Sequence, residues 1–303
     1  MAVAYSANFL DPQVLAGVNG LVLRARGIVE GNVTGLHRSP FHGFSVEFAE
    51  HREYSPGDDL RYVDWKVYGR TDKFYIKRFE QETNLSCYLL VDSSESMRFR
   101  SEGSPLSKWE YAQCASAALA YVLLNQQDRV GLTVFNDKVQ THVKPEAGMP
   151  HWYNIVGVLE GFQPAGKTDF GSVLNETAER AKQRGMVIIL SDFFTDLSRV
   201  EKGLKHLRHQ RHDLIVFQIV DRQEVTFDIE KPVVLKGLEG GAVLAVDPSW
   251  LRRAYQAKFR EFCLRLRRIC HDSLVDYVFV ETIHRFDKVL REFFSFRARY
   301  RRR

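Results

Sequence analysis

The sequence predicts an α/β fold, an open and mainly parallel sheet with helices on both faces. From about residue 85 onward, short apolar runs alternate with longer segments of helical periodicity. The apolar runs lack an alternating polar face, which is typical of strands buried on both sides of a parallel sheet. A chain of 303 residues with 45% hydrophobic residues can bury a sizeable core in one large domain or two smaller ones.

The elements follow one another in a regular order. Strands are expected at residues 85–91, 129–136, 186–190, 213–220 and 274–281, and residues 138–143 should turn back beside the second strand. Helices are expected at residues 108–125, 169–185, 198–210, 248–270 and 285–296. The first of these helices has a capping box, Ser107 and Glu110, at its start. Gly185 is expected to end the second.

The first 83 residues differ from the rest and predict an accessory region. A weakly helical opening precedes a segment rich in aromatic residues and turn signals, with short strands suggested by the alternation at residues 44–48. Dense alternating charge at residues 52–70 favours internal ion pairs, with Trp65 packed on the sheet domain, over a docking surface. The predicted divisions are an accessory region at 1–83, a sheet domain at 84–296 with a β insertion near 222–248, and a basic tail at 297–303.

The net charge and the cysteine content limit the partners and the cellular compartment that the sequence favours. Basic residues exceed acidic ones only by 43 to 38, so net charge does not by itself indicate a nucleic-acid partner. Four cysteines without a C-x-x-C pair favour a reducing compartment. The opening lacks the features of a signal peptide, and no apolar run reaches the length of a membrane span. We therefore expect a cytoplasmic protein, with peripheral membrane contact through the basic tail left open.

Oxygen-bearing side chains follow the predicted strands. Asp92 comes at the end of an apolar run, Ser94 and Ser96 follow at alternate positions, Thr168 precedes a predicted helix, and Asp192 follows another buried strand. The carboxyl ends of parallel strands meet at one edge of a sheet, where ligands bind. Carboxylates and hydroxyls suit Mg²⁺ or Mn²⁺, and a cation would relieve repulsion between the two aspartates. The alternative is that these side chains only cap backbone N–H groups.

This pattern resembles the metal-ion-dependent adhesion site of von Willebrand factor A domains. The motif D-x-S-x-S at 92–96, a lone threonine in a glycine-containing loop, and an aspartate after an apolar strand match it. Residues 128–137 resemble the second strand of that fold, and residues 52–70 resemble the segment that precedes it in the bacterial family called domain of unknown function 58. The resemblance covers roughly residues 39–294.

The resemblance implies a bound Mg²⁺ or Mn²⁺ with one coordination position left for a partner's carboxylate. It also implies work with a MoxR-type AAA+ ATPase and a client protein, in maturation or assembly of other proteins. The chain departs from the family pattern where Phe193 and Phe194 replace a common glycine, which leaves a water-mediated role for Asp192 open. The implied metal residues are Asp92, Ser94, Ser96, Thr168 and Asp192.

We expect a non-enzymatic protein-interaction module whose specificity comes from a rim formed by Arg98, Lys167, Phe193 and Phe194. One alternative is a metal-dependent phosphoryl-transfer or hydrolytic enzyme centred on Asp92, although a serine stands where a D-x-D phosphatase pattern has its second acid. Walker A, G-x-S-x-G and H-E-x-x-H motifs do not occur in the sequence. A third alternative is binding of nucleic acid or an anionic surface by the arginine-rich helix at 248–270 and the tail. Few aromatic residues lie between the arginines of the tail, so a stacking platform for single strands is not expected there, and we expect no nucleic-acid partner.

Overall fold

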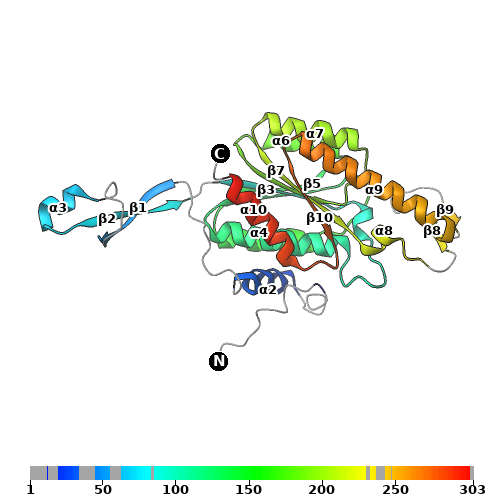
Figure 1. Cartoon of the computed structure of the whole chain (residues 1–303), viewed down its shortest axis with the longest axis horizontal. Helices are drawn as coiled ribbons and strands as arrows, with labels where there is room; N and C mark the ends of the chain where they lie inside the picture. Colours follow the sequence, from blue (N-terminus) through cyan, green and yellow to red (C-terminus); the bar gives the residue numbers. More distant parts are fainter. Residues whose placement is uncertain are drawn as a thin grey trace, which may run out of the picture.

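A six-stranded sheet forms the centre of the molecule (Figure 1). The computed structural model describes residues 12, 20–33, 45–54, 63–82, 85–229, 233–236, 243–246 and 248–300. The strand order is β10-β7-β6-β3-β4-β5, and every neighbouring pair is parallel except β4 and β5. The predicted mainly parallel sheet is confirmed. Its strands are β3 (Ser86–Asp92), β4 (Arg129–Phe135), β5 (Val139–Glu146), β6 (Gly185–Ser191), β7 (Asp213–Val220) and β10 (Asp276–Glu281).

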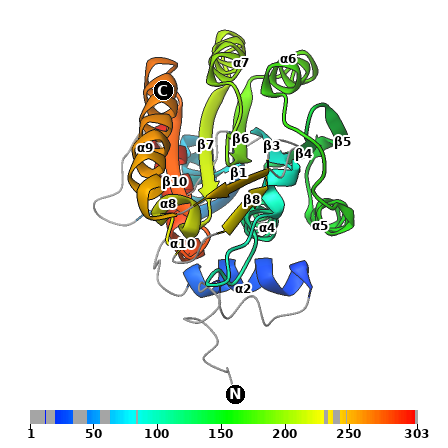
Figure 2. The same cartoon turned by 90° about the vertical axis from the view of Figure 1, so that its right-hand side faces the viewer.

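Helices cover both faces of the sheet, as Figure 2 shows. One face carries α4 (Lys108–Asn125), α5 (Met149–Gly161) and α10 (Phe286–Tyr300), and the other carries α6 (Phe170–Arg180), α7 (Leu197–His209) and α9 (Pro248–Asp272). Successive side chains of a strand point to opposite faces. Leu89 of β3 therefore packs in the first hydrophobic cluster, and Leu90 in the second.

The register of the central strands places their carboxyl ends at one edge. Asp92 pairs with Phe135 of β4, and Val91 pairs with Leu190 of β6. All seven residues of β3 are buried. The loops that follow β3 and β6 therefore start side by side, as the sequence predicted for its candidate site.

The helix α2 (Leu21–Val33) packs on the sheet domain although the predicted boundary at residue 83 separates the two. Leu21, Ala25 and Ile28 are buried in the same hydrophobic cluster as α4 and α5, and Figure 2 shows α2 against that layer. Burial of this apolar face stabilises the contact between α2 and the sheet domain, although the two are far apart in sequence. The boundary expected at residue 297 also falls inside an element, because α10 continues to Tyr300.

The rest of the described N-terminal region is a projecting arm (Figure 1). Strands β1 (Ser45–Glu53) and β2 (Tyr75–Glu82) pair antiparallel, and α3 (Trp65–Thr71) lies at their far end. Trp65 is 62% exposed and meets Tyr68 and Phe74 edge-on. The expectation that it packs on the sheet domain was wrong. Residues 55–62 of the predicted charge network lie outside the described residues.

Other elements differ from expectation in ways that have physical causes. The helix expected to end at Gly185 ends at Arg180, and Gly185 opens β6 instead. A Cβ at Gly185 would lie 2.2 Å from the carbonyl oxygen of Ser86, so glycine serves the close approach of two strands. The helix α5 was not predicted. The range of the expected β insertion holds α8 (Arg222–Thr226) and the antiparallel pair β8 (Val233–Lys236) and β9 (Val243–Val246).

A search of the described helices for a membrane span found none with the length and apolar character required.

Candidate metal site at the strand ends

Asp92 is the last residue of β3 and is fully buried. One carboxylate oxygen, Oδ1, accepts a hydrogen bond from the backbone N–H of Ser94 at 2.8 Å, and Oδ2 accepts one from Ser191 Oγ at 2.6 Å. Burial, and after it the negative charge of Asp192, raise the pKa of Asp92 to about 7, although these two hydrogen bonds act in the opposite direction. The carboxylate is thus held in place in an environment that disfavours its uncompensated charge.

The hydroxyls of Ser94 and Ser96 face each other. Ser94 precedes the short 3₁₀ helix η3 (Glu95–Arg98), yet its side chain makes no capping hydrogen bond to that helix. Its Oγ instead lies 3.1 Å from Oγ of Ser96. Both residues are buried. The capping alternative therefore does not describe the Ser94 hydroxyl.

Thr168 approaches Asp92 from a different loop, between α5 and α6. Its Oγ1 lies 3.5 Å from both carboxylate oxygens of Asp92. Two backbone bonds fix this loop beside η3, from Ala165 N–H to Ser93 O at 2.8 Å and from Glu95 N–H to Gly166 O at 2.9 Å. Gly166 has a φ of +78°, a conformation in which glycine is strongly favoured. Four of the five predicted metal residues thus lie together.

Asp192 follows β6 and is engaged elsewhere. Its Oδ2 lies 2.7 Å from Nζ of Lys108, and its Oδ1 accepts a hydrogen bond from Phe194 N–H at 3.0 Å. The same ammonium lies 2.6 Å from Oε1 of Glu224 on α8. Burial opposes the charge of Lys108, but Asp192 and Glu224 outweigh it and raise the pKa of the lysine. Within the described part of the chain, no hydrogen bond joins the Asp192 carboxylate to the other four predicted residues.

The two phenylalanines after Asp192 have different positions. Phe193 is fully buried and stacks on Phe170, with ring centroids 4.8 Å apart. Its assignment to the rim was wrong, because packing places it in the core. Its φ of 62° is left-handed, which is rare for a bulky residue. Phe194 is half-buried, and the ring lies 4.8 Å from the Lys108 ammonium. Arg98 and Lys167 are exposed as the rim requires.

The donor chemistry of the cluster fits a hard divalent cation. Asp92, Ser94, Ser96 and Thr168 offer oxygen atoms alone, as Mg²⁺ and Mn²⁺ prefer. In the wider buried cluster, the carboxylates of Asp192 and Glu224 share the ammonium of Lys108, and the charge of Asp192 also acts on the carboxylate of Asp92. One positive charge among three carboxylates leaves two negative charges uncompensated when all three are ionised. A search of the described residues for metal-binding groups of three or more His, Cys, Asp and Glu found none, as expected for a site built mainly from hydroxyls.

Three residues of this cluster were not predicted from the sequence. Ser191 directly precedes Asp192 at the end of β6, and its hydroxyl also accepts a hydrogen bond from Phe193 N–H at 2.8 Å. Lys108 begins α4, one residue after Ser107 of the confirmed capping box. A cation is unfavourable at a helix N-terminus, so a lysine there is a weak signal for a nearby acid. Glu224 carried no usable signal, since α8 was not predicted.

Comparisons with known proteins give the family. The model described as "Protein of unknown function DUF58" matches residues 50–262. The uncharacterized proteins Mb1516 of Mycobacterium bovis and Rv1480 of Mycobacterium tuberculosis are each 27% identical over 244 residues, which is 79% of this chain and 76% of theirs.

Solved structures with a similar arrangement include two proteins of remote sequence. The conserved hypothetical protein BatB from Bacteroides thetaiotaomicron has 16% identity and a TM-score of 0.49, over 71% of this chain and 99% of its own. The SpRpn10 VWA domain has 11% identity and a TM-score of 0.39, over 69% and 94%. The family match covers most of the sequence, and this chain belongs to the DUF58 family.

Proposed function

We propose that this chain is a protein-interaction module that binds Mg²⁺ or Mn²⁺ at the strand ends and uses the ion to hold an acidic residue of a partner. Asp92, Ser94, Ser96 and Thr168 would hold the ion, and Asp192 would act through water. The observation that carries the proposal is the buried carboxylate of Asp92, which the hydroxyls of Ser94 and Thr168 approach from two separate loops, with the hydroxyl of Ser96 beside that of Ser94. When bound, the ion supplies positive charge and a free coordination position.

Lys108 has a distinct part in this proposal. Its ammonium takes one oxygen of Asp192, and Phe194 N–H takes the other. Asp192 is thereby kept from being a second direct anionic ligand. An ion with Asp92 as its one carboxylate ligand retains more of its charge, and attracts a carboxylate from outside more strongly, than an ion with two. Ser191 and the Ser94 backbone orient Asp92 for this role.

The partner we propose is a MoxR-type AAA+ ATPase, with a client protein whose maturation or assembly the pair serves. This step rests on membership of the family and on the resemblance of residues 52–70, and it goes beyond the site itself. An ATPase would supply the energy of remodelling, since the sequence has no Walker A loop of its own. The chain would then provide the metal-dependent contact.

Binding of the purified chain to the MoxR-type ATPase of the same genome tests the proposal. The affinity should be measured in Mg²⁺ and in EDTA for wild type, for Thr168→Ala, and for Ser172→Ala as a matched control on the exposed face of α6. We expect binding that EDTA and Thr168→Ala abolish and Ser172→Ala preserves. Equal binding in Mg²⁺ and EDTA would contradict the metal-dependent contact, and no binding under any condition would contradict the choice of partner.

A further inference from the structure

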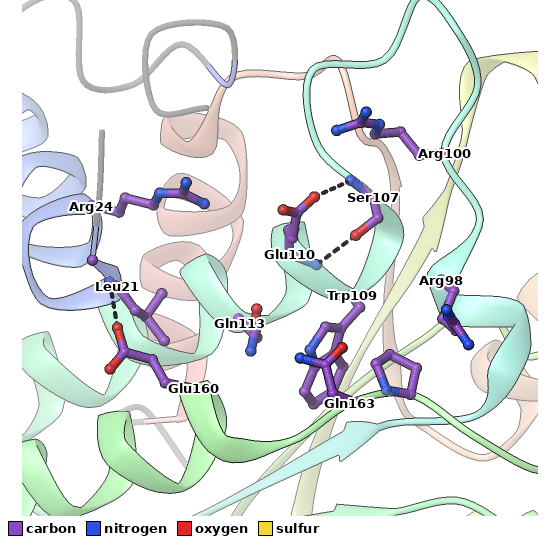
Figure 3. A pocket seen from close by; sticks show the side chains of 12 residues that line it. Leu21, Arg24, Arg98, Arg100, Ser107, Trp109, Glu110, Gln113, Glu160 and Gln163 are labelled. Carbon is purple, nitrogen blue, oxygen red and sulfur yellow. Dashed lines mark hydrogen bonds between the residues drawn. The ribbon is translucent and has the colours of Figure 1, made fainter. Parts of the chain in front are cut away.

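A polar pocket of about 440 Å³ is lined by residues of α2, η3, α4 and the end of α5 (Figure 3). Three of its lining residues are arginines, namely Arg24, Arg98 and Arg100, and two are glutamates, Glu110 and Glu160. Trp109, Ser107, Gln113, Gln163 and Pro164 also contribute to the walls. The pocket therefore has an excess of positive side chains over negative ones.

The glutamates of the pocket are already engaged by backbone amides. Glu110 accepts a hydrogen bond from Ser107 N–H at 2.8 Å in the capping box of α4, and Glu160 accepts one from Leu21 N–H at 2.7 Å. Figure 3 draws both bonds. The capping box also provides acceptors for two free backbone N–H groups at the start of α4, so these groups do not need an anion.

Two of the arginines are available to a ligand. Arg98 and Arg100 are exposed, and neither has an ion pair or hydrogen bond through its side chain within the described part of the chain. Figure 3 shows Arg24 and Arg100 extending toward the Glu110 side of the pocket from opposite sides. Guanidinium groups form strong, directional hydrogen bonds with carboxylates. An anionic ligand would balance the excess positive charge of this pocket.

Two segments of the chain contribute residues both to the pocket and to the candidate metal site. Arg98 and Ser96 both belong to η3, two residues apart. Pro164 lines the pocket, and the same loop reaches Thr168 four residues later. The first turn of α4 separates the two sites, because Ser107 and Trp109 line the pocket whereas Lys108 points to Asp192. A short peptide segment on this edge could reach both.

We propose that this pocket binds a second acidic side chain of the same protein partner, so that the partner presents a short acidic segment rather than a single carboxylate. One acidic residue ligates the ion, which rests on the proposed function, and a neighbouring one pairs with Arg98 and Arg100. The metal gives the contact its strength, and the arginines select partners with clustered acids. A charge-assisted hydrogen bond of this kind is worth enough to change an affinity about tenfold.

Fluorescence anisotropy with labelled peptides tests the pocket. The probes are Gly-Ser-Glu-Asp-Glu-Ser-Gly and its single-acid form Gly-Ser-Gln-Asp-Gln-Ser-Gly, measured in Mg²⁺ with wild type and with Arg98→Gln/Arg100→Gln. We expect the three-acid peptide to bind wild type about tenfold more tightly than the single-acid peptide, and the double variant to lose this ratio. Replacement of the exposed Arg222 and Arg291 by Gln is the matched control and should preserve the ratio.

The outcomes separate the pocket from the metal site. If the double variant keeps the wild-type ratio, or if wild type does not prefer the three-acid peptide, the pocket proposal is wrong. If EDTA and Asp92→Ala leave the affinity for both peptides unchanged, while the arginine variant loses the preference, the result supports the pocket and contradicts the metal site. Mg²⁺ affinity of the arginine variant, measured by calorimetry, should remain within about twofold of wild type because neither arginine is a proposed ligand.

Discussion

The ammonium of Lys108 lies 2.7 Å from Oδ2 of Asp192, and both side chains are sealed from solvent. Glu224 lies against the same ammonium at 2.6 Å and is largely shielded. Burial raises the pKa of Glu224, and Lys108 opposes that effect. This buried cation joins the end of β6, the start of α4 and the helix α8, so it ties together three segments that are far apart in sequence.

Lys108→Met should destabilise the protein by about 3–5 kcal/mol, because it leaves two buried carboxylates without their cation. Urea unfolding measures this change. Lys205→Met is the matched control, since Lys205 pairs with Glu201 on the exposed surface of α7, where such a pair contributes about 0.3–0.5 kcal/mol. Adding Asp192→Asn to Lys108→Met should restore part of the lost stability. Similar losses for Lys108→Met and Lys205→Met would argue that the buried pair has no special role.

Ser191→Ala should weaken Mn²⁺ binding by about 10–100-fold, as is typical when a residue that orients a metal ligand is removed. Ser191 donates to Asp92 at 2.6 Å and so fixes the carboxylate. Ser93→Ala is the control, because Ser93 is equally buried but donates to the carbonyl oxygen of Phe135. Calorimetric titration should show a loss of affinity for the first variant alone. Equal Mn²⁺ affinities of wild type and Ser191→Ala would show that Ser191 does not orient Asp92.

Two glycines in helices should respond to alanine in opposite directions. A Cβ at Gly203 of α7 would lie 2.6 Å from Cβ and Cδ1 of Leu174 on α6, whereas a Cβ at Gly157 of α5 would meet nothing within 4 Å. Gly203→Ala should cost about 1–3 kcal/mol through overpacking, and Gly157→Ala should stabilise by about 0.5–1 kcal/mol through helix propensity. Melting temperatures of the two variants check this. A stabilising Gly203→Ala would mean that α6 and α7 are less closely packed than described.

His212 should contribute a loss of stability as the pH is lowered from about 7.5 to 5.5, opposite in sign to the gain from Asp92, whose raised pKa lets the folded chain bind a proton in the same range. Burial lowers the pKa of His212, and the carbonyl groups of Ala181 and Gly185 and the charge of Asp213 only partly oppose this. A histidine with a folded pKa below its unfolded value of about 6.5 binds its proton preferentially in the unfolded chain, so stability present above that pH is lost below it.

Urea unfolding of His212→Gln at several pH values measures this contribution. Between pH 7.5 and 5.5 the variant should lose less unfolding free energy, or gain more, than wild type does, even if it is less stable throughout. His142 and His284 also have lowered pKa values, chiefly through burial, so they should contribute a loss of the same sign that the variant keeps. His209→Gln, on the exposed side of α7, should keep the wild-type slope. An unchanged slope in His212→Gln would contradict the assignment.

The sheet could be predicted from sequence because its strands are uniform apolar runs. Residues 213–220 were predicted as a strand and form β7, and the capping box at Ser107 marked the start of α4 to the residue. Local chemistry decides such features. The end of α6 could not be placed in the same way, because the role of Gly185 depends on the approach of β3 in space.

The candidate site was predictable only where a residue follows its strand directly. Asp92, Ser94 and Thr168 lie where the order of the strands implied, but Lys108 reaches Asp192 across 84 positions of the chain. A contact between residues so far apart in the chain cannot be recognised from a single sequence. Likewise, Phe193 looked like a rim residue beside Asp192, and only packing against Phe170 shows that it belongs to the core.

The central claim is that Asp92 and the hydroxyls around it bind a divalent cation. Calorimetric titration of metal-free protein with Mn²⁺ and Mg²⁺ tests it most directly, on wild type, on Asp92→Asn, and on Asp137→Asn as a control at a turn between β4 and β5 where the side chain is exposed. We predict one ion per chain for wild type and for Asp137→Asn, and none for Asp92→Asn. Absence of binding to wild type, or equal binding to Asp92→Asn, would contradict the claim.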